Sequence, residues 1–313
     1  MTLKLLGAST RVREKLTWRA LRSKVSFLLS RRTRWEGAAD PRQSDNARDT
    51  RRRFARLPFM ARIPDMGRLP VEDFSLLRED DKPPVLCVHG MIGAKGNWEV
   101  LAPHITDRRV FCVDYGDAGT APVDRSTDDL AAQIIDLSRR INARELILLG
   151  HSRGGIISLL AASRPDVQSV VTIRRVIGLG AHFSGIPRWR LLPAAASSQR
   201  PSEFFFSTMR RIAYWAVGAS STDQFTDSPT LVQALDQVDR SIEVISIASS
   251  TDYVVRPSSA FEVPTDHVHA VLMQDYFPGA KILHNLLPRD ARAIAMVKAA
   301  LARPFITREE EVR

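Results

Sequence analysis

Cysteine and long apolar runs are both scarce in this sequence. Its 313 residues include 2 cysteines, Cys87 and Cys112, which lie in short apolar segments typical of adjacent buried strands, where a reduced thiol behaves as a small hydrophobic side chain. We therefore expect no disulfide framework. No apolar stretch reaches the 18 residues that a membrane-spanning helix needs, and the longest apolar patch near the N-terminus, residues 25–29, is too short for a secretory signal. These absences favour a cytoplasmic protein.

The sequence also lacks two patterns that would indicate particular ligands. Its 7 histidines show no metal-ligand spacing such as H-E-x-x-H, so we expect neither a metal nor a cofactor. Residues 1–68 hold 18 of the 45 Lys and Arg and 6 of the 35 Asp and Glu, which leaves 27 and 29 for residues 69–313. A nearly neutral body without basic, aromatic-rich signatures argues against nucleic acid as a partner.

The positive charge gathers in the N-terminal segment instead. Residues 11–32 repeat apolar side chains every three to five positions with arginines and lysines between them, which predicts a basic amphipathic helix. Such a helix can lie on an anionic membrane surface, here the inner face of the membrane, or pack against the chain itself or a partner. The sequence leaves both open. Residues 36–57 indicate a solvated linker, so we assign residues 1–65 to an extension and 66–313 to the main domain.

From about residue 82 the chain alternates short apolar strand patterns with helix patterns. Strands are expected at 84–88, 110–113, 146–149, 176–179 and 242–247. One helix is expected to run to Ile141 with Ser126 or Thr127 as its N-cap, and a closing helix is expected over 289–301. Strands separated by helices predict an α/β fold, with a mainly parallel sheet covered by helices on both faces.

The most informative segment runs from Gly150 to Gly155. It follows one apolar run and precedes another, which indicates a strand, a sharp turn and a helix. In the pattern G-x-S-x-G, Gly150 and Gly154 flank Ser152 where strand and helix pass very close to each other. A serine on such a strained turn presents its hydroxyl at the end of the sheet, and we expect Ser152 to be a nucleophile.

A nucleophilic serine needs a base that takes its proton and a carboxylate that orients the base. In the fold that carries this serine turn, the acid follows the serine in chain order and the histidine comes last. Asp252 follows the strand pattern at 242–247, and His284 stands in a loop before the closing helix. We therefore assign Asp252 as the acid and His284 as the base. The weaker alternatives are Asp223, Asp227 and Asp266 for the acid and His104, His182, His267 and His269 for the base.

Backbone N–H groups must also hold the oxyanion of a reacting ester. We expect them from Arg153, the residue after the nucleophile, and from Met91 in the loop after the first strand. The Arg153 side chain has two possible roles, a structural one and the attraction of an acidic group on the substrate.

Residues 186–240 interrupt the alternation of strands and helices. They carry helix-like apolar patches with many aromatic side chains. We expect a helical cap insertion over the active site, with core packing as the alternative for some of these aromatics.

With these residues in place, the chain resembles bacterial α/β-hydrolase triacylglycerol lipases and their esterase relatives. The resemblance covers about residues 82–302 and rests on six segments in order, VLCVHGMIGAKGNWEVLAPHI, VFCVDYGDAG, LILLGHSRGG, GLGAHFSG, STDYVVRPSSAF and LHNLLPRDA. It implies the following site: Ser152 as nucleophile, Asp252 as acid, His284 as base, and Met91 and Arg153 as oxyanion donors. Secreted members carry a signal peptide and often disulfides, where this chain has a basic helix.

The resemblance implies a serine carboxylic-ester hydrolase, a lipase or esterase, that acts on lipidic or apolar acyl esters through an acyl-enzyme intermediate. Two other functions fit the same residues. An acyltransferase would pass the acyl group to an alcohol in place of water, and a catalytically silent, membrane-associated binding protein would retain only the fold.

Overall fold

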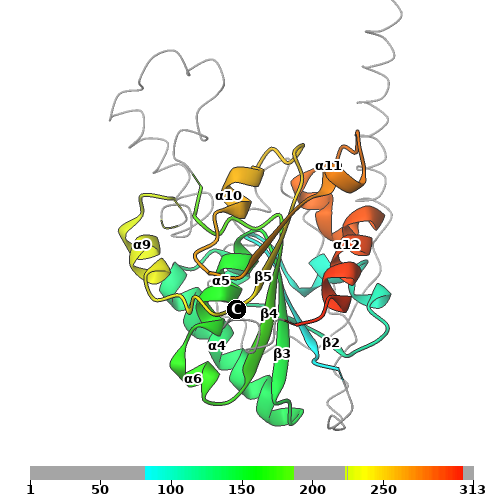
Figure 1. The fold of residues 1–313 in the computed structure, drawn as a ribbon. Coiled ribbons are helices and arrows are strands. Elements are labelled where there is room, and N and C mark those ends of the chain that lie inside the picture. The colour runs from blue at the N-terminus through cyan, green and yellow to red at the C-terminus, as the bar shows by residue number, and fades with distance from the viewer. Residues whose placement is uncertain (1–81, 187–222, 224, 306–313) are drawn as a thin grey trace, which may run out of the picture.

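The computed structural model describes residues 82–186, 223 and 225–305 (Figure 1). The predicted basic helix at 11–32, its linker and most of the segment 186–240 lie outside the described residues. The division into an extension and a main domain therefore stays a prediction.

A six-stranded sheet forms the centre of the described fold, with the strands in the order β2-β1-β3-β4-β5-β6. Every neighbouring pair is parallel, which confirms the predicted α/β fold. The strands are β1 (Val85–Val88), β2 (Val110–Val113), β3 (Glu145–His151), β4 (Thr172–Leu179), β5 (Val244–Ala248) and β6 (Val268–Leu272). The edge strand β6 is an addition to the predicted strands, because its partly exposed residues lack the continuous apolar run of the central strands.

Helices connect the strands and cover the sheet. They are α3 (Gly116–Gly119), α4 (Val123–Arg140), α5 (Arg153–Ala162), α6 (Pro165–Gln168), α9 (Pro229–Leu235), α10 (Pro257–Phe261), α11 (Met273–Tyr276) and α12 (Ala291–Ala302), with the 3-10 helices η1 (Lys95–Trp98), η2 (Ala102–His104) and η5 (His284–Arg289). The predicted closing helix is α12. Among the described residues no helix combines the length and apolar character needed to cross a bilayer.

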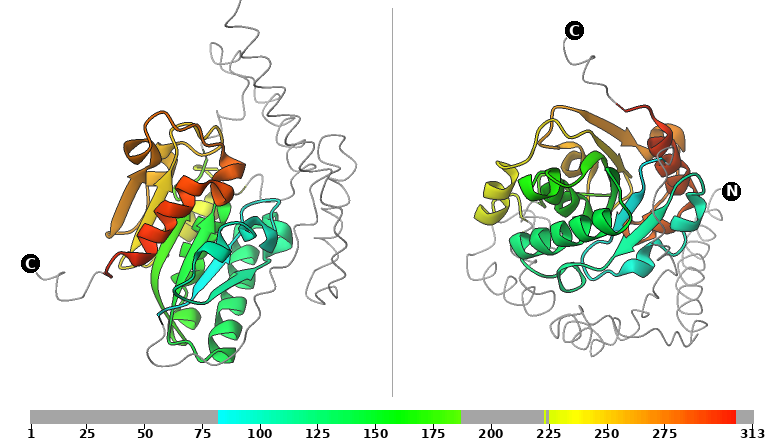
Figure 2. Two further views of the ribbon diagram at one scale, coloured as in Figure 1. Left: turned by 90° about the vertical axis from the view of Figure 1, so that its right-hand side faces the viewer. Right: turned by 90° about the horizontal axis from the view of Figure 1, so that it is seen from below.

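Both faces of the sheet are buried, and alternate residues of a strand serve opposite faces. In β1, Leu86 and Val88 belong to the core under α4 and α5, whereas Val85 and Cys87 belong to the core under η1, η2 and α12. Figure 2 shows α4 and α5 on one face of the sheet and α12 on the other. Burial on both faces explains why the central strands are continuous apolar runs in the sequence.

The helix α4 begins earlier than the sequence predicts. The prediction that Ser126 or Thr127 is its N-cap is wrong, because the helix begins at Val123, directly after Pro122. The Asp223 carboxylate accepts a hydrogen bond from the Val123 N–H at 2.6 Å and satisfies this end of the helix. The Ser126 and Thr127 hydroxyls donate instead to carbonyl oxygens of the preceding turn. Local sequence could not reveal a cap that comes from a residue 100 positions away.

The helix α9 belongs to the described part of the segment that is expected to form a cap. It packs against α4, and its residue Leu231 is buried in the core beneath α4 and α5. These residues therefore join the body of the domain. The cap predicted over residues 186–240 remains a prediction for those of its residues that lie outside the described part of the chain.

The two cysteines lie side by side on β1 and β2, as expected. Cys87 and Cys112 are directly opposite each other in the parallel register, and both are free thiols. Burial, together with the neighbouring Cys112, raises the pKa of the Cys87 thiol well above its usual value. Cys87 therefore stays protonated and behaves as a core residue.

A buried arginine in β4, Arg175, links the end of α12 to the sheet. The Arg175 guanidinium donates to the carbonyl oxygens of Ala300, Arg303 and Pro304, at the end of α12, over 2.6 to 3.0 Å. On its other side it pairs with Glu243 Oε2 at 2.7 Å. Because carbonyl groups at a helix C-terminus carry partial negative charge, the cation stabilises this end of α12 as well as the carboxylate.

Candidate active site

Ser152 joins β3 to α5 in a strained backbone conformation. Its φ of 54° and ψ of −128° lie in a region that residues with a side chain rarely occupy. Strain of this kind costs roughly 1–3 kcal/mol and gathers at functional sites. The Ser152 N–H donates to the Leu179 carbonyl oxygen of β4 at 3.1 Å, which ties the turn to the neighbouring strand. The predicted strand, turn and helix are thus present.

Glycines around the serine allow three backbone segments to meet. A Cβ on Gly150 would lie 2.4 Å from backbone atoms of α5, and a Cβ on Gly154 would lie 2.4 Å from two carbonyl oxygens at the end of β1. A Cβ on Gly90 would come within 2.9 Å of the Ser152 Cβ. The loop after β1 therefore runs directly past the serine, and each glycine is required by distance.

Asp252 and His284 reach Ser152 from two other loops. Asp252 follows β5, and His284 is the first residue of η5. The His284 Nδ1 lies 2.7 Å from Asp252 Oδ2, and the His284 Nε2 lies 2.8 Å from Ser152 Oγ. All three residues are buried. The structure thus brings the three side chains chosen from the sequence into one chain of hydrogen bonds.

The Asp252 carboxylate is held in a fixed orientation. Its Oδ1 accepts hydrogen bonds from the N–H groups of Val254 and Val255 at 2.8 and 2.9 Å, which leaves Oδ2 to face His284. With an ionised carboxylate at Nδ1, that nitrogen carries the proton and Nε2 presents its lone pair to the Ser152 hydroxyl. The arrangement can accept the serine proton and stabilise the imidazolium that results.

Hydrogen bonds between the two loops keep Asp252 and His284 at this spacing. Thr251 Oγ1 accepts from the Ile282 N–H at 2.9 Å and donates to the Ile282 carbonyl oxygen at 3.2 Å. The Gln274 side-chain amide donates to one oxygen in each of the two loops, both at 3.0 Å. Sequence reasoning missed these residues, since no motif marks them.

Two further buried histidines, His151 and His182, surround His284. The His151 Nε2 donates to the His284 carbonyl oxygen at 3.1 Å. Burial lowers the pKa of both His151 and His182 to about 3, with the nearby His284 adding to the shift for His151 and Arg153 for His182. Both rings stay neutral at ordinary pH. A proton on His284 therefore meets no charge repulsion from these two neighbours.

Of the alternative acids and bases, His182 lies near His284, whereas His267, His269, Asp266 and Asp223 lie elsewhere. His267 and His269 stand at the start of β6, at the opposite end of the sheet from the carboxyl ends where Ser152 lies. Asp266 forms an exposed ion pair, and Asp223 binds the first N–H of α4.

The two residues predicted to supply the oxyanion donors both belong to backbone segments next to Ser152. Arg153 is the first residue of α5, and Met91 follows Gly90, which borders the Ser152 side chain. The Arg153 side chain is 1% exposed and points toward α3 and α4. It is closed to a substrate, so the structural role is the one that the geometry supports.

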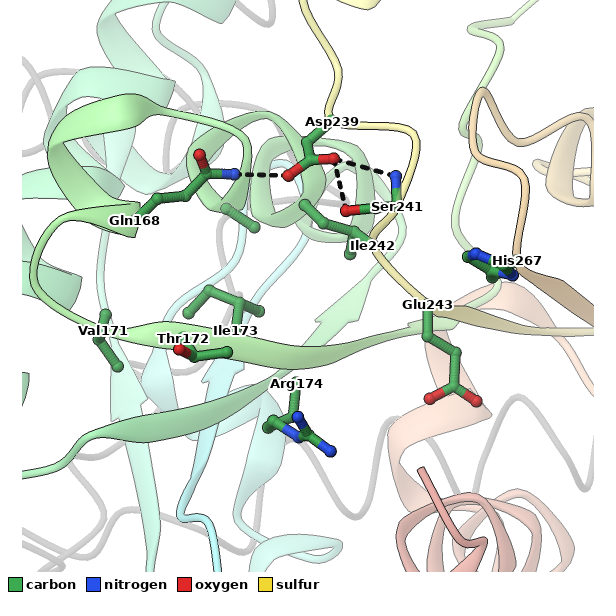
Figure 3. Close-up of a pocket in the computed structure, with 11 residues that line it drawn as sticks. Gln168, Val171, Thr172, Ile173, Arg174, Asp239, Ser241, Ile242, Glu243 and His267 are labelled. Carbon is green, nitrogen blue, oxygen red and sulfur yellow. Dashed lines mark hydrogen bonds between the residues drawn. The ribbon is translucent and has the colours of Figure 1, made fainter. Parts of the chain in front are cut away.

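A separate hollow of about 510 Å³ lies at the amino ends of β4 and β5. Among its lining residues, Asp239 accepts hydrogen bonds from the Gln168 amide and the Ser241 hydroxyl (Figure 3). The residues of the predicted triad do not line it.

A sequence profile described as alpha/beta hydrolase fold matches residues 83–261. The chain belongs to the α/β-hydrolase fold family. Ser152 and Asp252 lie within the matched region, and His284 lies beyond its end. The fold family inferred from the ordered motifs is therefore confirmed.

Several relatives of this α/β hydrolase are named as lipases. Over 111 residues, 33% of this chain, it is 35% identical to the sn-1-specific diacylglycerol lipase ABHD11 of Mus musculus, of which the match covers 36%. Over 140 residues, 42% of this chain, it is 26% identical to the same lipase of Danio rerio, of which the match covers 44%. The chain thus spans less than half the length of these curated relatives.

Solved structures share the architecture. The crystal structure of Aspergillus fumigatus lipase B aligns with a TM-score of 0.54 at 17% identity, over 72% of this chain and 53% of that one. At this identity the likeness extends to the fold alone.

Proposed function

We propose that this α/β hydrolase is a serine carboxylic-ester hydrolase of lipase or esterase type. The observation that carries the proposal is the continuous hydrogen-bonded chain from Ser152 Oγ through both ring nitrogens of His284 to the Asp252 carboxylate. Its support is the match between this arrangement and the needs of acyl transfer, which are a nucleophile, a base and a carboxylate that fixes the base.

In the proposed reaction, Ser152 Oγ bonds to the ester carbonyl carbon while its proton passes to His284 Nε2. Asp252 stabilises the imidazolium. The backbone N–H groups of Met91 and Arg153 hold the oxyanion. Collapse of the tetrahedral intermediate breaks the bond to the alcohol, which leaves with the proton from His284. Water, activated by the same histidine, then cleaves the acyl-enzyme and restores the serine.

We infer that the substrates are lipidic or apolar acyl esters. The diacylglycerol lipase name of the Mus musculus and Danio rerio relatives makes diacylglycerol the first natural ester to test. Hydrolysis of p-nitrophenyl esters of increasing chain length would define the acyl preference. Addition of glycerol to these assays would show whether an alcohol competes with water, as an acyltransferase requires.

The nucleophile is tested by the Ser152→Ala variant. It should lose p-nitrophenyl ester turnover by at least about 10⁴-fold with unchanged circular dichroism, because no other group replaces Oγ. A fluorophosphonate probe should label the wild-type chain at Ser152, as peptide mass spectrometry would report.

The matched control for that experiment is Ser158→Ala in α5, the helix that follows Ser152. The Ser158 hydroxyl is buried and donates only to a carbonyl oxygen one turn back, so its loss should leave turnover unchanged. Full turnover in the Ser152→Ala variant would refute the proposed function.

We also propose that residues 11–32 hold the protein at the inner face of an anionic membrane. The support is the amphipathic pattern and the excess of basic residues in this part of the sequence. The full chain should sediment with vesicles that contain phosphatidylserine and not with phosphatidylcholine vesicles. Binding should weaken as salt is raised. Equal binding to both kinds of vesicle would contradict an electrostatic contact.

A further inference from the structure

Residues 116–119 form one turn of left-handed helix near the site, here called the left-handed turn. The φ angles of Gly116, Asp117, Ala118 and Gly119 are 53°, 52°, 62° and 71°. This conformation costs a residue with a side chain roughly 1–2 kcal/mol of conformational free energy. Asp117 and Ala118 both adopt it. Such a turn persists only where the surrounding contacts hold it.

The left-handed turn supports the loop that carries Met91. A Cβ on Gly119 would lie 2.7 Å from the Gly90 carbonyl oxygen and 3.2 Å from the Met91 Cα, so the two backbones are in direct contact. The Gly93 N–H also donates to the Ala118 carbonyl oxygen at 3.2 Å. A shift of the turn would therefore displace the backbone at positions 90 and 91.

Arg153 holds the left-handed turn from its other side. The guanidinium Nη1 donates to the Gly119 carbonyl oxygen at 2.7 Å and lies 3.3 Å from Ser126 Oγ of α4. Its Nη2 lies 3.6 Å from Asp223 Oδ1. The side chain is almost completely buried. Burying a cation is costly unless its partners are well placed, and here the closest partner is the turn itself.

We propose that the Arg153 side chain is a positioning residue for the oxyanion site. Its own amide is one expected donor, and its guanidinium fixes the turn on which the Met91 loop rests. A single residue thus sets the distance between the two donors. This inference rests on the proposed ester hydrolysis. A misplacement of about 1 Å in such a site costs on the order of 10²-fold in rate.

The test compares Arg153→Met and Arg153→Lys with the wild type. Turnover of p-nitrophenyl butyrate is expressed per active site, counted by fluorophosphonate titration. Arg153→Met should lower kcat by about 10- to 100-fold with KM within a factor of about 3, since donor geometry matters most in the transition state. Arg153→Lys keeps the charge and one donor to the turn, so part of kcat should return.

Arg175→Lys is the matched control. Arg175 is as buried as Arg153 and also donates to main-chain carbonyl oxygens, but these belong to the end of α12. This variant should lose stability and keep the wild-type kcat per active site. The comparison separates a general loss of stability from a displaced oxyanion site.

The inhibition constant of a trifluoromethyl ketone is a readout that a general loss of stability would not change. Ser152 Oγ bonds to the ketone carbon, the serine proton passes to His284, and the ketone oxygen becomes an oxyanion. In Arg153→Met its inhibition constant should rise by the same factor by which kcat/KM falls, whereas in Arg175→Lys it should not change.

If Arg153→Met does not fold, Arg153→Lys with Ser126→Ala takes its place, because this pair also weakens the hold on the turn. The proposal is overturned if folded Arg153 variants keep kcat within about twofold of the wild type, or if Arg175→Lys loses kcat to the same extent. Failure of the proposed function is a different result, in which Ser152→Ala itself retains turnover.

Discussion

At position 154 a methyl group would lie 2.4 Å from the carbonyl oxygens of Val88 and His89 at the end of β1, well inside the contact distance of real side chains. Glycine is needed there by proximity. Gly279 offers the opposite case, because its φ is 74° and nothing lies within 4 Å of a Cβ built on it. The first glycine keeps two segments together near the serine, and the second only allows a turn.

We predict that Gly154→Ala lowers the free energy of unfolding by about 3 kcal/mol, the upper part of the range for overpacking. It should also lower kcat, because α5 must move away from β1. Gly279→Ala should cost about 1 kcal/mol from backbone strain and keep kcat. Urea denaturation and ester assays measure both. Similar effects of the two variants on kcat would refute the inference that Gly154, unlike Gly279, is required for the packing next to Ser152.

The buried histidines predict how stability depends on pH. In the folded state His151 and His182, with pKa values lowered to about 3, stay neutral, whereas the unfolded chain takes up protons on them below its ordinary pKa of 6.5. Their contribution to stability is therefore complete above pH 6.5 and is lost as the pH falls toward 3. The slope should reach roughly 1.4 kcal/mol per pH unit for each histidine.

This slope is measured by urea denaturation at several pH values between 7 and 4. His182→Leu should reduce it by about half. An unchanged slope in His182→Leu would show that His182 is protonated in the folded protein.

At the scale of elements, sequence patterns located five of the six strands because both faces of the sheet are buried. They failed at the start of α4, where the partner of the first N–H is Asp223, and at β6, whose residues are half exposed. The choice of Asp252 and His284, whose side chains the structure brings to Ser152, followed from chain order. The clamp formed by Thr251 and Gln274 did not, because its hydrogen bonds join loops that only the folded chain brings together.

We predict that Thr251→Val separates the Asp252 and His284 loops. It leaves the Ile282 N–H without its partner, which should cost about 1–3 kcal/mol in stability. It should also lower kcat more than it changes KM. Ser241→Ala removes an exposed hydroxyl that bonds Asp239 and is the control, expected to change stability by less than about 0.5 kcal/mol. An unchanged kcat in Thr251→Val would show that the hydrogen bonds of Thr251 do not keep Asp252 and His284 at their working distance.

At the scale of the whole molecule, Arg175 joins the middle of the sheet to the end of the described chain. No motif or periodicity in the sequence marks it, because an arginine in an apolar strand has no local partner. Its contacts with α12 and Glu243 are made by tertiary folding alone. The architecture could thus be predicted from local pattern, whereas the buried charges that complete it could not.

Arg175→Met should lower the free energy of unfolding by about 3–5 kcal/mol, because Glu243 would remain buried without its cation. Arg175→Met combined with Glu243→Gln should recover part of this loss. Urea denaturation of the single and double variants measures the coupling. If the double variant is no more stable than Arg175→Met alone, the unpaired Glu243 carboxylate is not the cause of the stability loss in Arg175→Met.

The position of the Arg175 partners also bears on how the chain folds during synthesis. Three of the oxygens that accept hydrogen bonds from this guanidinium belong to residues 300–304. While the ribosome still holds that segment, the Arg175 guanidinium of β4 lacks these three acceptors. Burying it at that stage would remove its water without replacing all of its hydrogen bonds. We expect the sheet to remain open on the α12 side until residues 300–304 have left the ribosome and can pack against β4.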